Sequence, residues 1–324
     1  MRIRQYLDPF TLSLVGILVV GIVVPIPHGA IDILTWLGTV AVMILFLVYG
    51  MRLPTGEVWA GLRNIRLQGA VLAATFILFP LLGAFTHPLL TPLLGTAFAA
   101  GTLYLTLLPS TVQSSVSFTS MAGGNVAGAV CAATISNISG MVLTPALVML
   151  VMGASTGVGW DSVVKVLTQL LIPFIVGQFL QPYLGEKVRA SKWLTKGVDR
   201  GTILIVVAAG VAGATARGLW DEVAWTDAVA LVFTSALILA LMLTATWFGG
   251  KLLGLNRADR IALLMCGSKK SLATGLPMAA IIFPVHLVAA VTVPVIVFHQ
   301  LQLMVAAVLA RHLAITGAGS DSTW

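Results

Sequence analysis

Long apolar stretches separated by short polar segments make up most of the chain. A helix needs about 20 apolar residues to cross the hydrocarbon core of a bilayer, and it satisfies its own backbone polar groups there. The pattern predicts ten spans: 10–26, 33–51, 67–85, 96–120, 126–152, 164–183, 201–216, 226–248, 261–283 and 287–310. We therefore expect an all-α integral membrane protein with ten transmembrane helices.

Composition excludes the soluble classes. Hydrophobic residues make up 58% of the 324 residues, and Asp, Glu, Lys and Arg only 9%, whereas soluble domains carry roughly a quarter charged residues. Such a chain cannot cover a water-facing surface of this size, and it is too apolar to be disordered. Cys131 and Cys266 both lie in apolar stretches and indicate no disulfide framework.

The positive charges predict the orientation of the spans. With a cytoplasmic N-terminus, 14 of the 18 Lys and Arg residues fall on the cytoplasmic side. Only Lys165 and Arg217 fall in outside segments. This positive-inside bias favours cytoplasmic N- and C-termini, in a bacterial-type plasma (inner) membrane. The net charge of +7 is then a topology signal that requires no nucleic-acid partner.

Two lysines do not fit this arrangement, because Lys269 and Lys270 lie inside the predicted ninth span. A lysine at the bilayer centre costs about 2.5–3.5 kcal/mol, and all eleven Asp and Glu residues lie in loops, in tails or at the ends of predicted spans. In one interpretation the side chains extend to a membrane interface. In the other, the amines meet an anion or backbone carbonyls in a polar cavity, and apolar sequence on both sides favours this second interpretation.

The ninth span also has the composition of a broken helix. Gly267, Gly275 and Pro277 weaken helix, and the hydroxyls of Ser268 and Ser271 can bond freed backbone groups. The fourth span has a matching polar stretch over 109–120, which is either a seam of packing serines or a second break. Broken helices at corresponding positions of two halves are typical of substrate sites in secondary transporters.

The paired interruptions predict an inverted repeat. The fourth and ninth spans are each the fourth in a block of five, and an odd number of spans reverses the orientation of the second block. We expect one repeat over 1–155, a second over 156–312, and a disordered tail over 313–324.

Polar residues near these breaks define the candidate site. The fifth span adds hydroxyls and an amide, although helix-packing serines are an equally good interpretation of them. The candidate substrate and ion site comprises Gln113, Ser114, Ser115, Thr134, Ser136, Asn137, Ser268, Lys269, Lys270 and Ser271. His299, on the tenth span, is a second-tier candidate that a packing role explains better.

Two segments resemble a known family. The run from Pro109 through Gly123-Gly124-Asn125 to Pro145, together with Cys266-Gly267-Ser268-Lys269-Lys270-Ser271, is similar to the bile acid:sodium symporter superfamily, SBF-like branch. The resemblance covers about 1–312. It implies two five-helix inverted repeats, with a panel of spans 1, 2, 6 and 7 and a core of spans 3–5 and 8–10. It implies as well that the broken helices four and nine cross near the midplane. It also implies organic anions as substrates.

Departures from the family concern sodium. The resemblance places Ser114 and Ser115 on a Ser-Asn pair of the sodium-coupled members, Thr134 at or beside a Thr, Met265 on a Glu, and Lys269 on a Gln. These positions are at most vestigial sodium ligands, because a carboxylate is lost and a fixed cation is gained. No other cofactor is expected.

We expect a secondary active transporter of an organic anion that works by alternating access, without the family's sodium coupling. In this hypothesis Lys269 or Lys270 replaces the bound cation, and one of them could exchange a proton. The alternatives are a non-transporting sensor or regulator of the same fold, and a sodium-coupled symporter with altered ligands. A passive channel or exchanger is a further alternative, whereas no nucleophile, metal cluster or nucleotide loop indicates an enzyme. Oligomeric state is left open.

Overall fold

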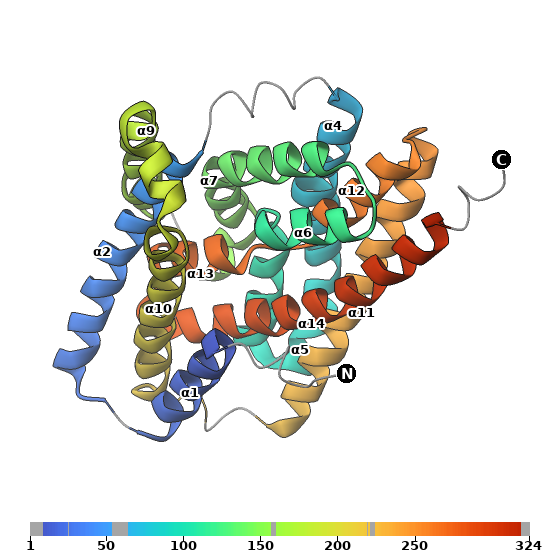
Figure 1. The fold of residues 1–324 in the computed structure, drawn as a ribbon. Coiled ribbons are helices and arrows are strands. Elements are labelled where there is room, and N and C mark those ends of the chain that lie inside the picture. The colour runs from blue at the N-terminus through green and yellow to red at the C-terminus, as the bar shows by residue number, and fades with distance from the viewer. Residues whose placement is uncertain are drawn as a thin grey trace, which may run out of the picture. The chain divides into compact units, whose positions relative to one another are not determined.

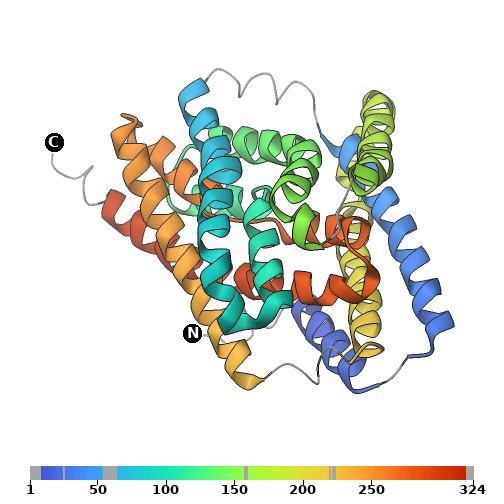
Figure 2. The same cartoon turned by 180° about the vertical axis from the view of Figure 1, so that it is seen from behind.

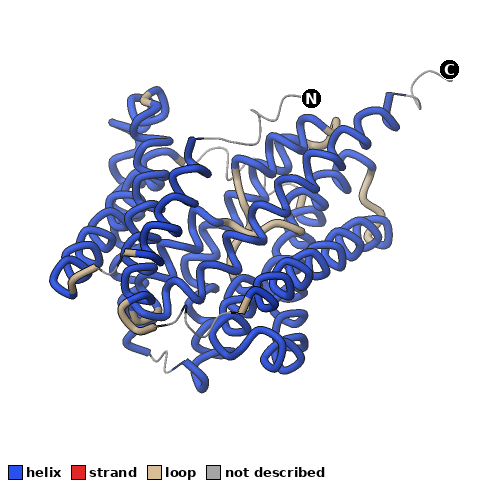
Figure 3. The backbone as a smooth tube through the Cα atoms, turned by 90° about the horizontal axis from the view of Figure 1, so that it is seen from below, coloured by secondary structure: helices blue, strands red, loops and turns tan. Residues whose placement is uncertain are grey.

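A computed structural model describes residues 9–24, 26–53, 64–156, 160–218, 220 and 224–318. Over these residues all regular secondary structure is helical (Figure 3). The all-helical expectation is therefore confirmed for the part of the chain that the structure describes.

The helices follow one another with short connections (Figure 1). They are α1 (Pro9–Val23), α2 (His28–Arg52), α4 (Ile65–Ala73), α5 (Phe79–Leu107), α6 (Gln113–Met121), α7 (Val126–Thr156), α8 (Trp160–Val166), α9 (Ile172–Ala190), α10 (Val198–Thr215), α11 (Trp225–Leu252), α12 (Arg257–Gly267), α13 (Leu272–Ile282) and α14 (Val285–Ala318). Three short π-helical segments join them: η2 (Ala74–Leu78), η3 (Leu167–Leu171) and η4 (Trp193–Gly197). Pro80 and Pro173 follow η2 and η3 within two residues, and a proline ring that displaces the preceding turn explains the wider winding.

Among the residues that the structure describes, seven helical runs are long and apolar enough to cross a membrane: His28–Arg52, Ile65–Leu107, Val126–Gly153, Val164–Ala190, Trp193–Thr215, Trp225–Leu252 and Val285–Thr316. The run Ile65–Leu107 joins the predicted third span to the first half of the fourth. The predicted ninth span is divided into α12 and α13, which have 11 residues each. The count of ten spans and the inverted repeat stay predictions.

One sharp turn lies within α5, at Gly95. Its backbone has φ 69° and ψ 166°, a combination that is essentially restricted to glycine. Figure 2 shows α4 continuing into the first part of α5. After the turn, the second part of α5 runs back beside them. The second part of α5 ends at Leu107, where the first helix interruption begins.

Helix extends into two segments outside the predicted spans. Helix α9 continues to Ala190 and η4 begins at Trp193, so most of the segment 184–200, between the predicted sixth and seventh spans, is helical. The many Lys and Arg residues there are compatible with an amphipathic helix end, where cations favour the C-terminal carbonyls. Helix α14 continues to Ala318, so the disordered tail expected at 313–324 is helical at its start, and 319–324 lie outside the described residues.

The chain divides into two compact units. Unit 1 contains residues 1–54, 152–225 and 276–293, and unit 2 contains 55–151, 226–275 and 294–324. Helices α7, α13 and α14 contribute residues to both units.

Unit 1 is built around the close packing of α2 and α9, which run side by side (Figure 1). A Cβ atom at Gly50 or Gly177 would collide with the backbone of the other helix, so only glycine allows this approach. At the end of α2, the Arg52 guanidinium forms an ion pair with Asp199 on α10, at 3.2 Å.

Unit 2 is organised around α12. One side of this helix packs Leu263 and Cys266 against α4 and α7, and the other packs Met265 against α14. At its start, the Asp259 carboxylate accepts hydrogen bonds from the side-chain amides of Asn64 (3.0 Å), Asn125 (2.6 Å) and Asn256 (3.1 Å). The bonds from Asn64 and Asn125 hold the beginning of α12 against the segments that precede α4 and α7, and the bond from Asn256 is local to the start of α12.

Candidate functional site

The candidate site is formed by two helix interruptions in unit 2. Residues 108–112 are non-helical between α5 and α6, and residues 268–271 are non-helical between α12 and α13. Pro109 explains the first break, because a proline disfavours helical backbone at the residue before it and donates no backbone hydrogen bond. The second break follows Gly267. Gly275 and Pro277, which the sequence also marked as helix-weakening, lie within α13.

The two interruptions are bonded directly to each other; we call this region the crossing (residues 108–112 and 268–271 with the side chains that bond them). The backbone N–H of Ser271 donates to the Pro109 carbonyl at 2.8 Å. The Ser110 hydroxyl donates to the Cys266 carbonyl at 2.6 Å, and the Ser115 hydroxyl to the Met265 carbonyl at 2.7 Å. Carbonyls at the end of α12, which lack helical partners, are thus satisfied by hydroxyls from the other interruption.

Helix α7 supports the crossing through two of the predicted residues. The Ser136 hydroxyl accepts from the Ser110 N–H at 3.0 Å, and the Asn137 amide donates to the Ser110 carbonyl at 2.7 Å. The Asn137 carbonyl oxygen accepts from the Thr274 hydroxyl at 2.8 Å. Asn137 therefore connects both interruptions. Thr134 is buried on the same helix, but its hydroxyl takes part in none of these hydrogen bonds between described residues of the crossing.

Lys270 fills the centre of the crossing. Its side chain is 0% exposed. The ammonium donates to the carbonyls of Thr75 (2.9 Å), Thr106 (2.8 Å) and Leu108 (2.6 Å), and it stands 4.1 Å from the centroid of the Phe79 ring. All three N–H groups of the ammonium have partners. Two of these carbonyls belong to the C-terminal end of α5, where partial negative charge accumulates.

Lys269 has a much poorer set of partners. It is 1% exposed, and its ammonium lies 4.3 Å from the centroid of the Phe118 ring. Its single described hydrogen bond is a long one, 3.5 Å to the Ser114 carbonyl. In the part of the chain that the structure describes, no carboxylate forms an ion pair with either lysine. Because both amines are buried, neither reaches the surface as the interface interpretation requires.

His299 belongs to a bonded network beside Lys270. The Lys270 N–H donates to the Gln302 side-chain oxygen, and the Gln302 amide donates to the Lys270 carbonyl, both at 2.9 Å. These two bonds fix the orientation of the Gln302 amide, so its second N–H points at His299 Nδ1, 2.8 Å away. His299 Nδ1 therefore accepts a hydrogen bond, which supports the packing interpretation of this histidine.

The other predicted residues bond locally or take no part in the crossing. Ser114 and Ser115 share the Thr111 hydroxyl at 2.7 Å each. Ser268 donates to the Leu264 carbonyl and closes the end of α12 locally. Gln113 is exposed at the start of α6 and takes no part in the crossing.

Several partners escaped sequence reasoning. Thr75, Thr106 and Leu108 contribute backbone carbonyls, and because every residue has one, the residue type does not indicate this role. The Tyr104 hydroxyl donates to the Gly275 carbonyl at 2.7 Å. A signal for Tyr104 existed in its position within an otherwise apolar stretch, because a buried tyrosine hydroxyl usually needs a partner.

Two positions of the crossing differ from the sodium ligands that the family resemblance implies. The Met265 side chain offers a thioether where the family resemblance expects a carboxylate, and Lys269 offers a cation where it expects an oxygen. Among the described residues there is no group of three or more His, Cys, Asp or Glu that could hold a metal.

Comparisons with known proteins agree with this architecture. The sequence profile of the SBF-like CPA transporter family matches residues 8–315. An uncharacterized protein of Pseudomonas aeruginosa, PA2026, is 41% identical over 315 residues, which cover 97% of this chain and 95% of that protein. A protein of Escherichia coli strain K12 that carries the name "Putative symporter YfeH" is 41% identical over 317 residues, or 96% of this chain and 94% of that protein.

More distant similarity extends to vertebrate proteins. Sodium/bile acid cotransporter 7 of Xenopus tropicalis is 27% identical over 276 residues, which cover 83% of this chain and 80% of the cotransporter. The relatives whose names state an activity, the putative symporter and the cotransporter, are named for transport and not for catalysis.

Proposed function

The chain belongs to the SBF-like CPA transporter family, and from this premise we propose that it carries a small organic anion across the membrane without binding sodium at the family's positions. The protein is an integral, multi-pass membrane transporter by its relatives and its apolar helices. The organic-anion substrate, the bacterial inner membrane, the cytoplasmic termini and the absence of sodium coupling are parts of the proposal. So is alternating access, with spans 1, 2, 6 and 7 as one moving part and the remaining spans as the other.

The observation that carries the proposal is the position of the Lys270 ammonium. It is bonded to three carbonyl oxygens from η2, α5 and the first interruption, within 2.9 Å or less. Oxygen ligands of this kind are also what a hard metal cation requires. In the proposal, the Lys270 ammonium takes the place of a bound sodium ion. It holds the two broken helices together.

Lys269 takes a different role in the proposal. Its ammonium has one long hydrogen bond and an aromatic face, so its charge is incompletely satisfied inside the protein. An anionic solute or the release of a proton would each relieve this deficit. We assign Lys269 as the group whose charge is coupled to transport.

Sodium at the vestigial positions is disfavoured on electrostatic grounds. Two like charges 4 Å apart repel by about 4 kcal/mol at an effective dielectric constant of about 20. The lost carboxylate at Met265 removes the attraction that would offset this repulsion.

Flux measurements in reconstituted vesicles test the proposal. The full chain is reconstituted, labelled small organic anions are supplied, and sodium and pH gradients are imposed separately. Wild type is expected to accumulate an anion without a sodium gradient, and Lys269→Ala is expected to abolish this uptake. Lys251→Ala, an exposed lysine at the end of α11, is the matched control and should transport normally.

Two outcomes would overturn the proposal. Uptake that sodium alone drives, and that survives Lys269→Ala, would restore the sodium-coupled alternative. Saturable anion binding with no flux in any gradient would instead favour the sensor or regulator.

A further inference from the structure

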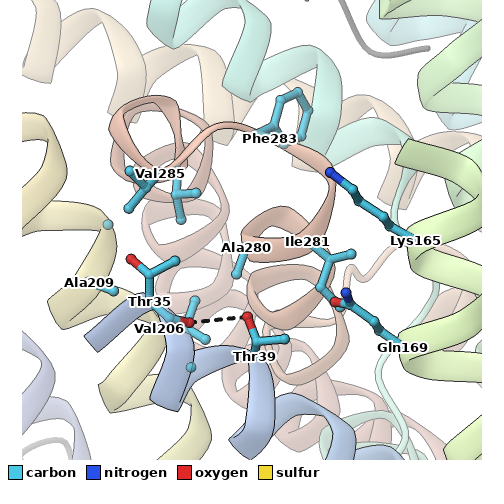
Figure 4. A pocket seen from close by; sticks show the side chains of 13 residues that line it. Thr35, Thr39, Lys165, Gln169, Val206, Ala209, Ala280, Ile281, Phe283 and Val285 are labelled. Carbon is cyan, nitrogen blue, oxygen red and sulfur yellow. Dashed lines mark hydrogen bonds between the residues drawn. The ribbon is translucent and has the colours of Figure 1, made fainter. Parts of the chain in front are cut away.

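Unit 1 contains a cavity of about 270 Å³ outside the crossing (Figure 4). Its walls come from α2, from the end of α8 with η3, from α10 and α13, and from the start of α14. This volume is slightly below the lower end of the usual range for small-molecule pockets, about 300 Å³, so the cavity suits only a small ligand. No residue of the predicted site lines it.

One wall of the cavity supplies hydrogen-bond donors. Lys165 and Gln169 lie one helical turn apart, and Figure 4 shows their amine and amide on the same side. In the described part of the chain the Lys165 amine forms no ion pair, although Asp161 lies one turn before it. Lys165 is also one of two lysine or arginine residues that the topology prediction places outside, against the positive-inside bias.

The opposite wall supplies acceptors. The hydroxyls of Thr35 and Thr39 line the cavity, and each donates its hydrogen within α2, to the carbonyls of Ile31 (2.8 Å) and Thr35 (3.1 Å). A hydroxyl whose hydrogen is already used can offer only lone pairs to a ligand. These two groups therefore favour a ligand that carries a hydrogen-bond donor.

The rest of the lining is apolar. Val206, Ile281, Phe283 and Val288 close the cavity between the polar walls. The lining thus has one cationic end, one accepting side and an apolar body, which is the usual composition of a pocket for an amphipathic small molecule.

We propose that this cavity binds a small organic acid with a hydroxyl group on an apolar body. The carboxylate meets Lys165 and Gln169, the hydroxyl donates to Thr35 or Thr39, and the apolar part packs against Phe283 and its neighbours. The site rests on the proposed function, because it names the class of organic anion that the transporter takes, but it can be tested by binding alone.

Calorimetry on the full chain in lipid nanodiscs tests the site with three probes. Mandelate has the carboxylate and the hydroxyl, phenylacetate lacks the hydroxyl, and 1-phenyl-1,2-ethanediol lacks the carboxylate. Mandelate is expected to bind most tightly. Lys165→Ala should weaken mandelate binding about tenfold or more, because a charge-assisted contact is lost, while Lys251→Ala should leave it unchanged.

Two further variants probe the accepting wall and the volume. Thr39→Val should weaken mandelate severalfold and leave phenylacetate unaffected, since only mandelate uses the hydroxyl. Gly38→Ala adds a methyl group to the lining with its nearest neighbour at 3.8 Å, so it should fold normally and weaken both acids.

Parallel measurements of mandelate binding and of anion flux on the wild-type chain separate the site from the proposed function. Equal binding of mandelate and the diol, mandelate binding that Lys165→Ala leaves unchanged, or no saturable mandelate binding would each overturn the cavity assignment. Wild-type binding with no flux of any anion would overturn the transport function and leave the cavity site standing.

Discussion

The crossing in unit 2 and the cavity in unit 1 both contain lysines, but they use them in opposite ways. At the crossing, Lys270 is fully buried and its three N–H groups all meet backbone carbonyls. In the cavity, Lys165 is exposed beside open volume and has no ion-pair partner in the described chain. The role of a lysine therefore follows from its unused donors and not from its presence in an apolar sequence.

Lys269 lies between these extremes. It is as buried as Lys270, but it has a single, long hydrogen bond. Four substitutions test this difference between the lysines.

Lys270→Met should have the largest effect on folding. It leaves three buried carbonyls without a donor, and each such loss costs about 1–3 kcal/mol. We expect a fall of about 3 kcal/mol or more in the free energy of unfolding, measured by denaturation of the purified protein in detergent. Lys251→Met, at an exposed position, is the control. An unchanged midpoint for Lys270→Met would show that the carbonyls do not depend on this ammonium.

Gly140→Ala should come next, because the added Cβ would lie 2.7 Å from the Pro109 side chain. Overpacking of this kind costs about 1–3 kcal/mol, and it would displace the first interruption. The same denaturation measurement compares it with Gly69→Ala, where the added methyl group meets no atom within 4 Å. Gly69→Ala should stabilise its helix slightly. Equal effects of the two variants would mean that α7 does not constrain Pro109.

Lys269→Met should change stability by less than Lys270→Met, by about 1 kcal/mol, because only one weak hydrogen bond is lost. Uptake of labelled organic anion into vesicles should nevertheless fall at least about tenfold, since the charge assigned to transport is gone. If Lys269→Met is as destabilising as Lys270→Met, both lysines are structural and the distinction between them disappears.

Lys165→Gln should have the smallest effect on folding, within about 0.5 kcal/mol, as expected of an exposed residue without an ion pair. Its effect should appear only as weaker binding of organic acids. Thermal denaturation without mandelate measures the effect on stability. The additional stabilisation by mandelate measures binding, because a ligand that binds the folded state stabilises it. A large loss of stability without ligand would contradict the assignment of Lys165 to ligand binding.

Sequence reasoning located the crossing because its causes are local. Pro109 and Gly267 disfavour helix through their own backbone chemistry, and two lysines in an apolar stretch require partners. Gly275 and Pro277 weaken helix in the same way and yet lie within α13, so residue type alone does not fix where a helix ends. Ser110 and Ser115 lie in the predicted polar stretch 109–120, and their hydroxyls bond backbone carbonyls of α12. The helix in 184–200 lies outside the predicted spans, because a charged segment without strong apolar periodicity resembles a loop and an exposed helix equally well.

What the sequence alone determined is the environment of the chain and the positions where its helices break. Hydropathy follows directly from residue type, and helix termination follows from the backbone chemistry of proline and glycine. The sequence does not show which of the two lysines has hydrogen-bond partners for all its N–H groups, because that depends on the folded arrangement. Backbone carbonyls such as those of Thr75 and Thr106 occur at every position, so only the folded arrangement shows which of them converge on one ammonium. The same holds for the cavity in unit 1, whose lining residues come from distant segments that share no sequence signal.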